Sequence, residues 1–246
     1  GVSVISSSAF TMNGGAISGN TVVGGGGGGV LVGGGTFTMQ GGTISGNTAG
    51  RFSGGNGGDG GGVYIYRGAA FTMKGGTISR NTAGGGKGGG VYAGGMFTME
   101  GGAISGNTAS AISGGGGGGG VYVGGGAFTM YNGAISGNSA ANGAGGGACV
   151  REGSRFTMEG GAISGNTAGF GGAVYVGDSR FVMRGGTISG NTASGYGGAV
   201  FVHSDIFTKS GGVIYGSNAS GGQANKALRG AAVYSIKEGA SENTMW

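Results

Sequence analysis

Proline is absent from this 246-residue chain, and cysteine and histidine occur once each. The lack of proline and of a strict three-residue glycine period excludes a collagen triple helix, although 75 residues are glycine. Cys149 has no second cysteine to pair with, which excludes an internal disulfide framework and a cysteine metal cluster. No apolar run approaches the roughly 18 residues of a transmembrane helix, so we expect no membrane-spanning segment.

Charge is also scarce, with 13 lysines and arginines against 8 aspartates and glutamates. The net charge of +5 is spread along the chain without a basic run, so we expect no nucleic-acid partner. Catalysis needs titratable groups within reach of one another, and this chain offers few. We therefore expect no enzyme and no cofactor, and we expect the single histidine, His203, to be a surface residue.

What the sequence does contain is a repeat. Apolar residues recur at fixed intervals, which a disordered glycine linker would not need. The unit reads F-T-M-x-G-G-[AT]-I-S-G-N and begins at Phe10, Phe37, Phe71, Phe97, Phe128, Phe156, Phe181 and, in degraded form, Phe207. An asparagine follows ten residues after each of the first seven phenylalanines. A G-G-[VA]-Y-V segment comes 8 to 16 residues later, so a single corner of the unit accepts insertions.

Each unit holds three apolar segments, typified by Phe-Thr-Met, Ala/Thr-Ile-Ser and Val-Tyr-Val. They are too short for helices and alternate with period 2, as strands do. The sequence therefore predicts an all-β protein: a right-handed single-stranded parallel β-helix of about eight coils, with three short strands per coil and glycine-rich loops on one edge. We expect one domain over 1–246, with regular coils over 1–206 and a degenerate terminal coil with a cap over 207–246.

Alternation assigns the side chains to faces. Phenylalanine and methionine of the first segment point inward, the isoleucines fill a second wall and paired valines such as Val121 and Val123 fill a third. The threonine between phenylalanine and methionine points outward. An aromatic column also points outward, either to stack on sugar rings or a partner or to be covered by the glycine loops. We take its members as the candidate binding residues: Tyr64, Tyr92, Tyr122, Tyr175, Phe201 and Tyr234.

The asparagines at the end of each unit predict a second column. Stacked side-chain amides form ladders between coils, although an asparagine that merely tolerates a left-handed turn is the alternative. The members are Asn20, Asn47, Asn81, Asn107, Asn138, Asn166 and Asn191. Glycine runs at Gly24–Gly29, Gly84–Gly90 and Gly114–Gly120 lie on the corner that accepts insertions, either as flexible loops or as stacked segments.

The two ends depart from the pattern. Val2-Ser3-Val4 matches the third strand, so the chain opens within a coil, and we expect a fragment or processed product with an uncapped first coil. Near the other end Lys209 replaces the inward methionine and Asn218 follows Ile214 one residue late. The glycine-free stretch from Gln223 to Arg229 is compatible with a helix, which is typical of a terminal cap.

Two further surfaces suggest alternative functions. Glu152, Asp178 and Asp205 follow the third strand on successive coils, and stacked carboxylates there would suit a polysaccharide-cleaving β-helix or a cation, although neighbouring arginines oppose this. The regular threonine and serine columns, with so little surface charge, would suit ice binding.

The unit resembles a known class of repeat. G-G-A-I followed by S-G-N-T, F-T-M-N at Phe10–Asn13 and G-G-A-V-Y at Gly171–Tyr175 look like the repeats of bacterial right-handed β-helix surface proteins, including polymorphic outer membrane protein adhesins. The resemblance implies a secreted or surface-displayed stalk or adhesin passenger. Its expected partners are cell-surface glycans or proteins, or further copies of itself joined end to end into filaments.

Overall fold

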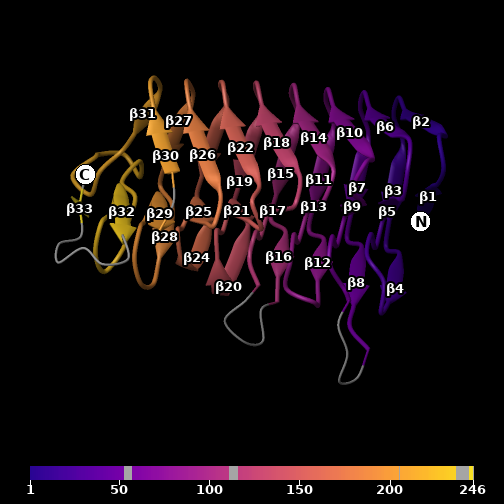
Figure 1. Ribbon diagram of the computed structural model, residues 1–246, viewed down its shortest axis with the longest axis horizontal. Helices are drawn as coiled ribbons and strands as arrows, with labels where there is room; N and C mark the ends of the chain where they lie inside the picture. Colours follow the sequence, from indigo (N-terminus) through magenta and orange to yellow (C-terminus); the bar gives the residue numbers. More distant parts are fainter. Residues whose placement is uncertain (53–56, 111–115, 205, 237–243, 246) are drawn as a thin grey trace.

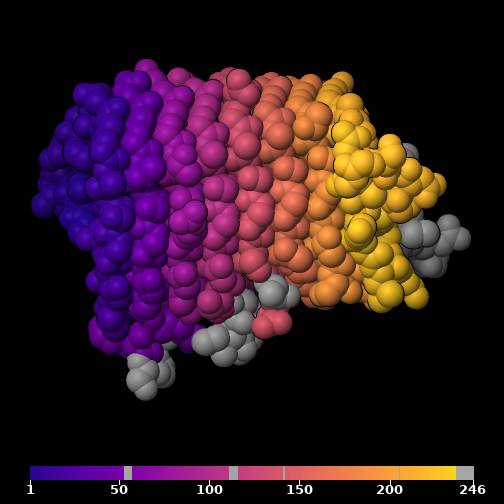
Figure 2. All heavy atoms as spheres, turned by 180° about the vertical axis from the view of Figure 1, so that it is seen from behind, coloured from indigo at the N-terminus to yellow at the C-terminus, as the bar shows by residue number. Residues whose placement is uncertain are grey.

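The coils of the chain stack along one axis as a parallel β-solenoid, seen as successive bands from indigo to yellow in Figures 1 and 2. This computed structural model describes residues 1–52, 57–110, 116–204, 206–236 and 244–245. All named elements in these ranges are strands, as the sequence predicts. Within the same ranges no helix is long and apolar enough to cross a membrane.

The Phe-Thr-Met segments form the first wall, which we call the phenylalanine sheet. Equivalent residues face each other across every step, as Phe37 pairs with Phe71 and Phe71 with Phe97. Such parallel, in-register pairing follows from a repeat whose strand positions are constant. The strands are β2 (Ala9–Met12), β6 (Thr36–Met39), β10 (Ala70–Met73), β14 (Met96–Met99), β18 (Ala127–Met130), β22 (Arg155–Met158), β26 (Arg180–Met183) and β30 (Ile206–Lys209).

The second wall is the isoleucine sheet and the third is the valine sheet. The isoleucine sheet contains β3 (Ala16–Ser18), β7 (Thr43–Ser45), β11 (Thr77–Ser79), β15 (Ala103–Ser105), β19 (Ala134–Ser136), β23 (Ala162–Ser164), β27 (Thr187–Ser189) and β31 (Val213–Ile214). The valine sheet contains β1 (Val2–Val4), β5 (Val30–Val32), β9 (Val63–Ile65), β13 (Val91–Ala93), β17 (Val121–Gly124), β21 (Ala148–Arg151), β25 (Val174–Gly177), β29 (Val200–His203), β32 (Val233–Ile236) and β33 (Thr244–Met245). The three predicted strands per coil are thereby confirmed.

A fourth stack of short strands, the threonine sheet, was not predicted. It starts directly after each asparagine, at the corner that accepts insertions, and forms the lower edge of the rod in Figure 1. Its members begin with threonine or serine followed in most coils by a buried alanine, such as Ala83 or Ala140. They are β4 (Thr21–Val23), β8 (Thr48–Gly50), β12 (Thr82–Ala83), β16 (Thr108–Ala109), β20 (Ser139–Ala144), β24 (Thr167–Phe170) and β28 (Thr192–Ala193).

The core lies inside the three main walls. Phenylalanine, methionine, isoleucine and valine from every coil meet there, and most are fully buried. The phenylalanine rings stack from coil to coil, with centroids 4.7 Å apart for Phe37 and Phe71 and 4.6 Å for Phe128 and Phe156. This spacing is the distance between neighbouring strands of a sheet, about 4.8 Å, so strand pairing and ring stacking reinforce each other.

The predicted asparagine ladder is present. Each asparagine donates through Nδ2 to Oδ1 of the asparagine on the next coil, for example over 2.9 Å from Asn81 to Asn107. The same Oδ1 also accepts the backbone N–H of the preceding member, and Nδ2 donates to an isoleucine carbonyl in the preceding coil, as Asn81 does to Ile44. The side chains from Asn47 to Asn191 are buried, so the ladder is satisfied inside the protein, where hydrogen bonds matter most.

The ladder has one more member than the sequence predicted. Asn191 donates to Asn225 over 2.9 Å, and Asn225 in turn donates to the carbonyl of Ile188. Asn218, which follows Ile214 one residue late, is exposed. The stretch from Gln223 to Arg229 is not a helix but a turn followed by isolated bridges, because the ladder and the neighbouring coil hold it extended.

The glycine runs are ordered where the structure describes them. Gly28 donates to the carbonyl of Gly60, Gly61 to Gly88 and Gly89 to Gly118, so backbone bonds join these loops from coil to coil. Of the third run, residues 114 and 115 lie outside the described ranges. These loops therefore form a stacked layer beside the threonine sheet.

Candidate functional site

The predicted aromatic column lies on the outer face of the valine sheet. As alternation requires, its side chains are excluded from the main core and form a second cluster with Ala144, Cys149 and Ile236. Ring centroids are 4.4 Å apart for Tyr64 and Tyr92 and 5.3 Å apart for Tyr175 and Phe201. The column is thus a real structural unit.

Most of the column is nevertheless covered, which is the alternative that the glycine loops offered. Tyr64 is half-buried, whereas Tyr92, Tyr122, Tyr175, Phe201 and Tyr234 are each no more than 9% exposed. The cover is the loop layer, which lies so close that a Cβ at Gly26 would collide with the ring of Tyr64. Burial accordingly raises the pKa of both Tyr92 and Tyr122.

Cys149 interrupts the column. It pairs with Tyr122 on one side and Tyr175 on the other, at a position where neighbouring coils carry aromatic rings. Charged side chains lie over the two rings next to Cys149. Lys87 Nζ is 5.1 Å from the centre of the Tyr122 ring, and the Arg151 guanidinium is 4.7 Å from the centre of the Tyr175 ring. Cations above ring faces are attracted by the electron density of the ring.

Glu152 and Asp59 complete this polar group. Glu152 Oε1 accepts from the Tyr122 hydroxyl at 2.9 Å and from Lys87 Nζ at 3.2 Å. Burial raises the pKa of Asp59, and the positive charge of Lys87 opposes that rise. These contacts give Glu152 a structural role as a link between loop layer and aromatic column.

Cys149 itself is unsuited to nucleophilic chemistry. Its side chain is fully buried, and burial raises its pKa to about 12. The thiolate is the reactive form of cysteine, so the folded protein should not react with an aromatic disulfide reagent at neutral pH, whereas one thiol should react after unfolding in guanidinium. A Ser18→Cys variant, with an exposed thiol, is the positive control. Rapid labelling of Cys149 in the folded wild type would refute this assignment.

Two members of the predicted acidic column, Glu152 and Asp178, lie at equivalent turns directly after strands β21 and β25 of the valine sheet. Glu152 and Asp178 occupy left-handed turn positions, with φ of 63° and 54°, and Ser204 occupies the next one with φ of 62°. Asp205 lies outside the described residues. His203, half-buried, lies beside Phe201 with its ring centroid 6.5 Å away. In the described ranges no group of three or more histidine, cysteine, aspartate and glutamate side chains is placed to hold a metal ion.

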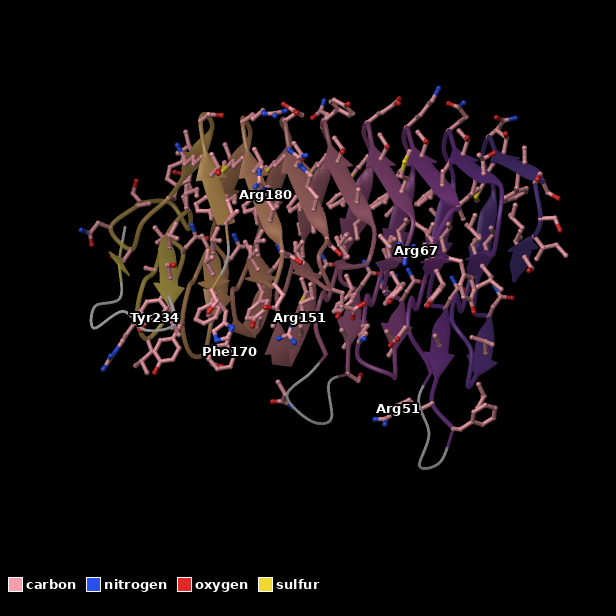
Figure 3. All side chains as sticks on the ribbon, in the orientation of Figure 1. Arg51, Arg67, Arg151, Phe170, Arg180 and Tyr234 are labelled. Carbon is pink, nitrogen blue, oxygen red and sulfur yellow. The ribbon has the colours of Figure 1, made fainter. Side chains whose placement is uncertain are left out.

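The C-terminal half of this region contains a pocket. A pocket of about 310 Å³ is lined by aromatic rings from β24, β25 and β29 together with Arg151 and His203. Figure 3 shows Arg151 and Phe170 on the same lower edge of the rod. Phe170, the last residue of β24, and Tyr196, which follows β28, were missed as site residues because they lie in the segment of variable length. The only signal was an aromatic residue just before G-G-[AV] in two successive coils.

Comparison with known proteins adds nothing to this geometry. No protein-family model, curated protein or solved structure matches the chain. The fold implied by the resemblance to β-helix surface proteins is present, and the role that it implies is taken up below as a proposal.

Proposed function

We propose that the protein is a non-enzymatic extracellular stalk or adhesin. In this proposal a stiff rod holds the loops between the asparagine and the valine strand, its variable edge, at a fixed position. The observation that supports this best is the asparagine ladder, which links the coils from Asn20 to Asn225 through side-chain amides that are buried from Asn47 onward. Parallel stacks of phenylalanine and isoleucine follow the same axis. A rod whose neighbouring coils are joined by several independent ladders resists bending and sliding of one coil over another.

The variable edge is the part suited to contact with partners. Insertions between the asparagine and the valine strand all project from one side, while the spacing from phenylalanine to asparagine stays at ten residues in the first seven units. Exposed apolar residues on this edge include Phe52 and Phe170, at 59% and 42% exposure. Loops on a rigid scaffold are the usual carriers of recognition. Glycans or proteins at a cell surface, and other copies of the chain, are the partners that we propose.

Stiffness can be measured with paired spin labels. Thr11 and Thr208 are exposed residues on the first and last strands of the phenylalanine sheet, separated by seven strand steps, so cysteines introduced there should give one narrow distance near ~34 Å. The buried Cys149 should stay unlabelled. A Thr11→Cys/Thr129→Cys pair, four steps apart, should give ~19 Å. A broad or two-peaked distribution for the longer pair would contradict a stalk.

The same preparation separates the remaining roles. Retention on cell surfaces or glycan-coated plates supports the adhesin, and long particles in the electron microscope support filaments. Release of reducing ends from polysaccharides that falls in an Asp178→Asn variant would instead identify the polysaccharide-cleaving alternative. Thermal hysteresis that is lost when outward threonines are replaced would identify ice binding.

A further inference from the structure

The pocket beside the break in the aromatic column combines two kinds of surface. Its walls are the rings of Phe170, Tyr175, Tyr196 and Phe201, and its polar groups include Arg151 and His203. Its volume, about 310 Å³, is at the small end of the range for ligand pockets. The space therefore suits one ring-sized molecule and is too small for a long chain to enter whole.

The aromatic rings that line the pocket are inclined to one another. Phe170 lies 5.6 Å from Phe201 at an interplanar angle of 49°, and 5.9 Å from Tyr196 at 29°. Phe170 keeps 42% of its surface exposed although it is fully apolar. An exposed phenylalanine next to half-buried Tyr196 offers a hydrophobic ledge on which a flat ring can stack.

Arg151 gives the pocket its charge. Its guanidinium is held over the ring of Tyr175 at 4.7 Å, in the room that the small Cys149 leaves in the column. Among the described residues no carboxylate forms an ion pair with it, and its Nε is buried without a hydrogen-bond partner. A guanidinium fixed in this way, without an acidic partner, is suited to a planar anion such as a carboxylate.

We propose that this pocket binds a ring-shaped monocarboxylate, with the ring against Phe170 and Tyr196 and the carboxylate toward Arg151. Two sources share this chemistry: an acidic sugar residue such as a uronate, and an aromatic acid. The site does not depend on the stalk function, since its parts come from neighbouring coils whatever the rod does.

Ligand-observed NMR tests the proposal with four probes. Glucuronate and benzoate carry the carboxylate, and glucose and benzyl alcohol are their neutral counterparts. We expect at least one carboxylate probe to bind with about tenfold or higher affinity than its neutral counterpart, because a hydrogen bond to a charged group raises affinity by about this factor. Preference for glucuronate identifies a sugar ligand, and preference for benzoate an aromatic acid. Equal binding of charged and neutral probes, or binding of none, overturns the proposal.

Two variants and two matched controls assign any binding to this pocket. Arg151→Gln should remove the preference for carboxylates, and Phe170→Ala should weaken binding about tenfold for charged and neutral probes alike. Phe170 is largely exposed, so this variant should fold even if Arg151→Gln is unstable. Arg67→Gln and Phe52→Ala change exposed residues of the same types elsewhere and should leave binding unchanged. A control that matches its partner's effect would show nonspecific binding and overturn the site.

Discussion

Replacing Asn138 by alanine is expected to lower the free energy of unfolding by about 4 kcal/mol. Its Oδ1 accepts the backbone N–H and Nδ2 of Asn107, and its Nδ2 donates to Asn166 Oδ1 and to the carbonyl of Ile104. The variant leaves the Asn107 N–H buried without a partner, at about 1–3 kcal/mol, and removes three further buried hydrogen bonds, at about 1 kcal/mol each. For a chain of this size the loss corresponds to a fall in melting temperature of about 12 °C, measurable by circular dichroism.

Two variants separate the ladder from the mere loss of a side chain. Asn218→Ala removes an exposed asparagine outside the ladder and should change stability by less than about 0.5 kcal/mol. Asn138→Asp keeps the shape and the acceptor but loses the donor, so it should be destabilised at neutral pH and partly recover in acid, where the protonated carboxyl can donate. A small effect of Asn138→Ala, or equal effects at positions 138 and 218, would show that the ladder is not a source of stability.

Gly119→Ala is expected to destabilise the protein by about 3 kcal/mol through close approach of two backbones. A Cβ at this position would lie 2.6 Å from the N, C and O atoms of Ser139, which opens the next strand of the threonine sheet. Backbone atoms of a paired strand cannot yield as a flexible side chain does, so the loop layer must move away. Its backbone bond to Gly145 should then open, seen as faster amide hydrogen exchange at Gly119.

Gly14→Ala is the control substitution for Gly119→Ala. Gly14 is exposed, has no heavy atom within 4 Å of its prospective Cβ and has no left-handed backbone, so its substitution should leave unfolding within about 0.5 kcal/mol of wild type. If Gly119→Ala and Gly14→Ala have the same free energy of unfolding, the loop layer is loosely packed and the close approach of the two backbones does not affect stability.

The three main walls were predictable because period-2 alternation and constant spacing act together. Phe37, Phe71 and Phe97 stand at identical places in units of different total length, which only a stack with fixed strands allows. The asparagine ladder followed from the same constancy. In both cases the same residue type stands at the equivalent position of each neighbouring coil, so the position of a residue in the repeat determines its contact.

The threonine sheet and the last ladder member were not predictable in this way. A strand of two residues, such as Thr82–Ala83, is too short to show alternation, and its bonds come from the coils on either side. Asn225 lies 11 residues after Ile214, whereas the earlier ladder members lie three residues after their isoleucine, so the spacing of the repeat does not reach it. Contacts across coils, rather than local preference, decide these segments.

The candidate site was predictable in part. Alternation placed the aromatic column outside the core. The alternating pattern does not show what covers that face of the sheet, and the loop layer buries most of the rings. The roles of Arg151 and Phe170 depend on a gap left by Cys149 and on the path of a loop of variable length. Neither can be derived from the repeat itself.

The direction of the asparagine ladder gives the rod a polarity. In each bond between ladder asparagines, from Asn20 to Asn225, the Nδ2 donor belongs to the earlier coil and the Oδ1 acceptor to the following coil, so the bonds of the ladder all run in one direction along the axis. At the ladder position a coil therefore presents an amide donor to the following coil and an amide acceptor to the preceding one. Two such rods can continue the ladder only head to tail, because a two-fold arrangement sets like against like. Any axial assembly built on the ladder must be unidirectional and open-ended.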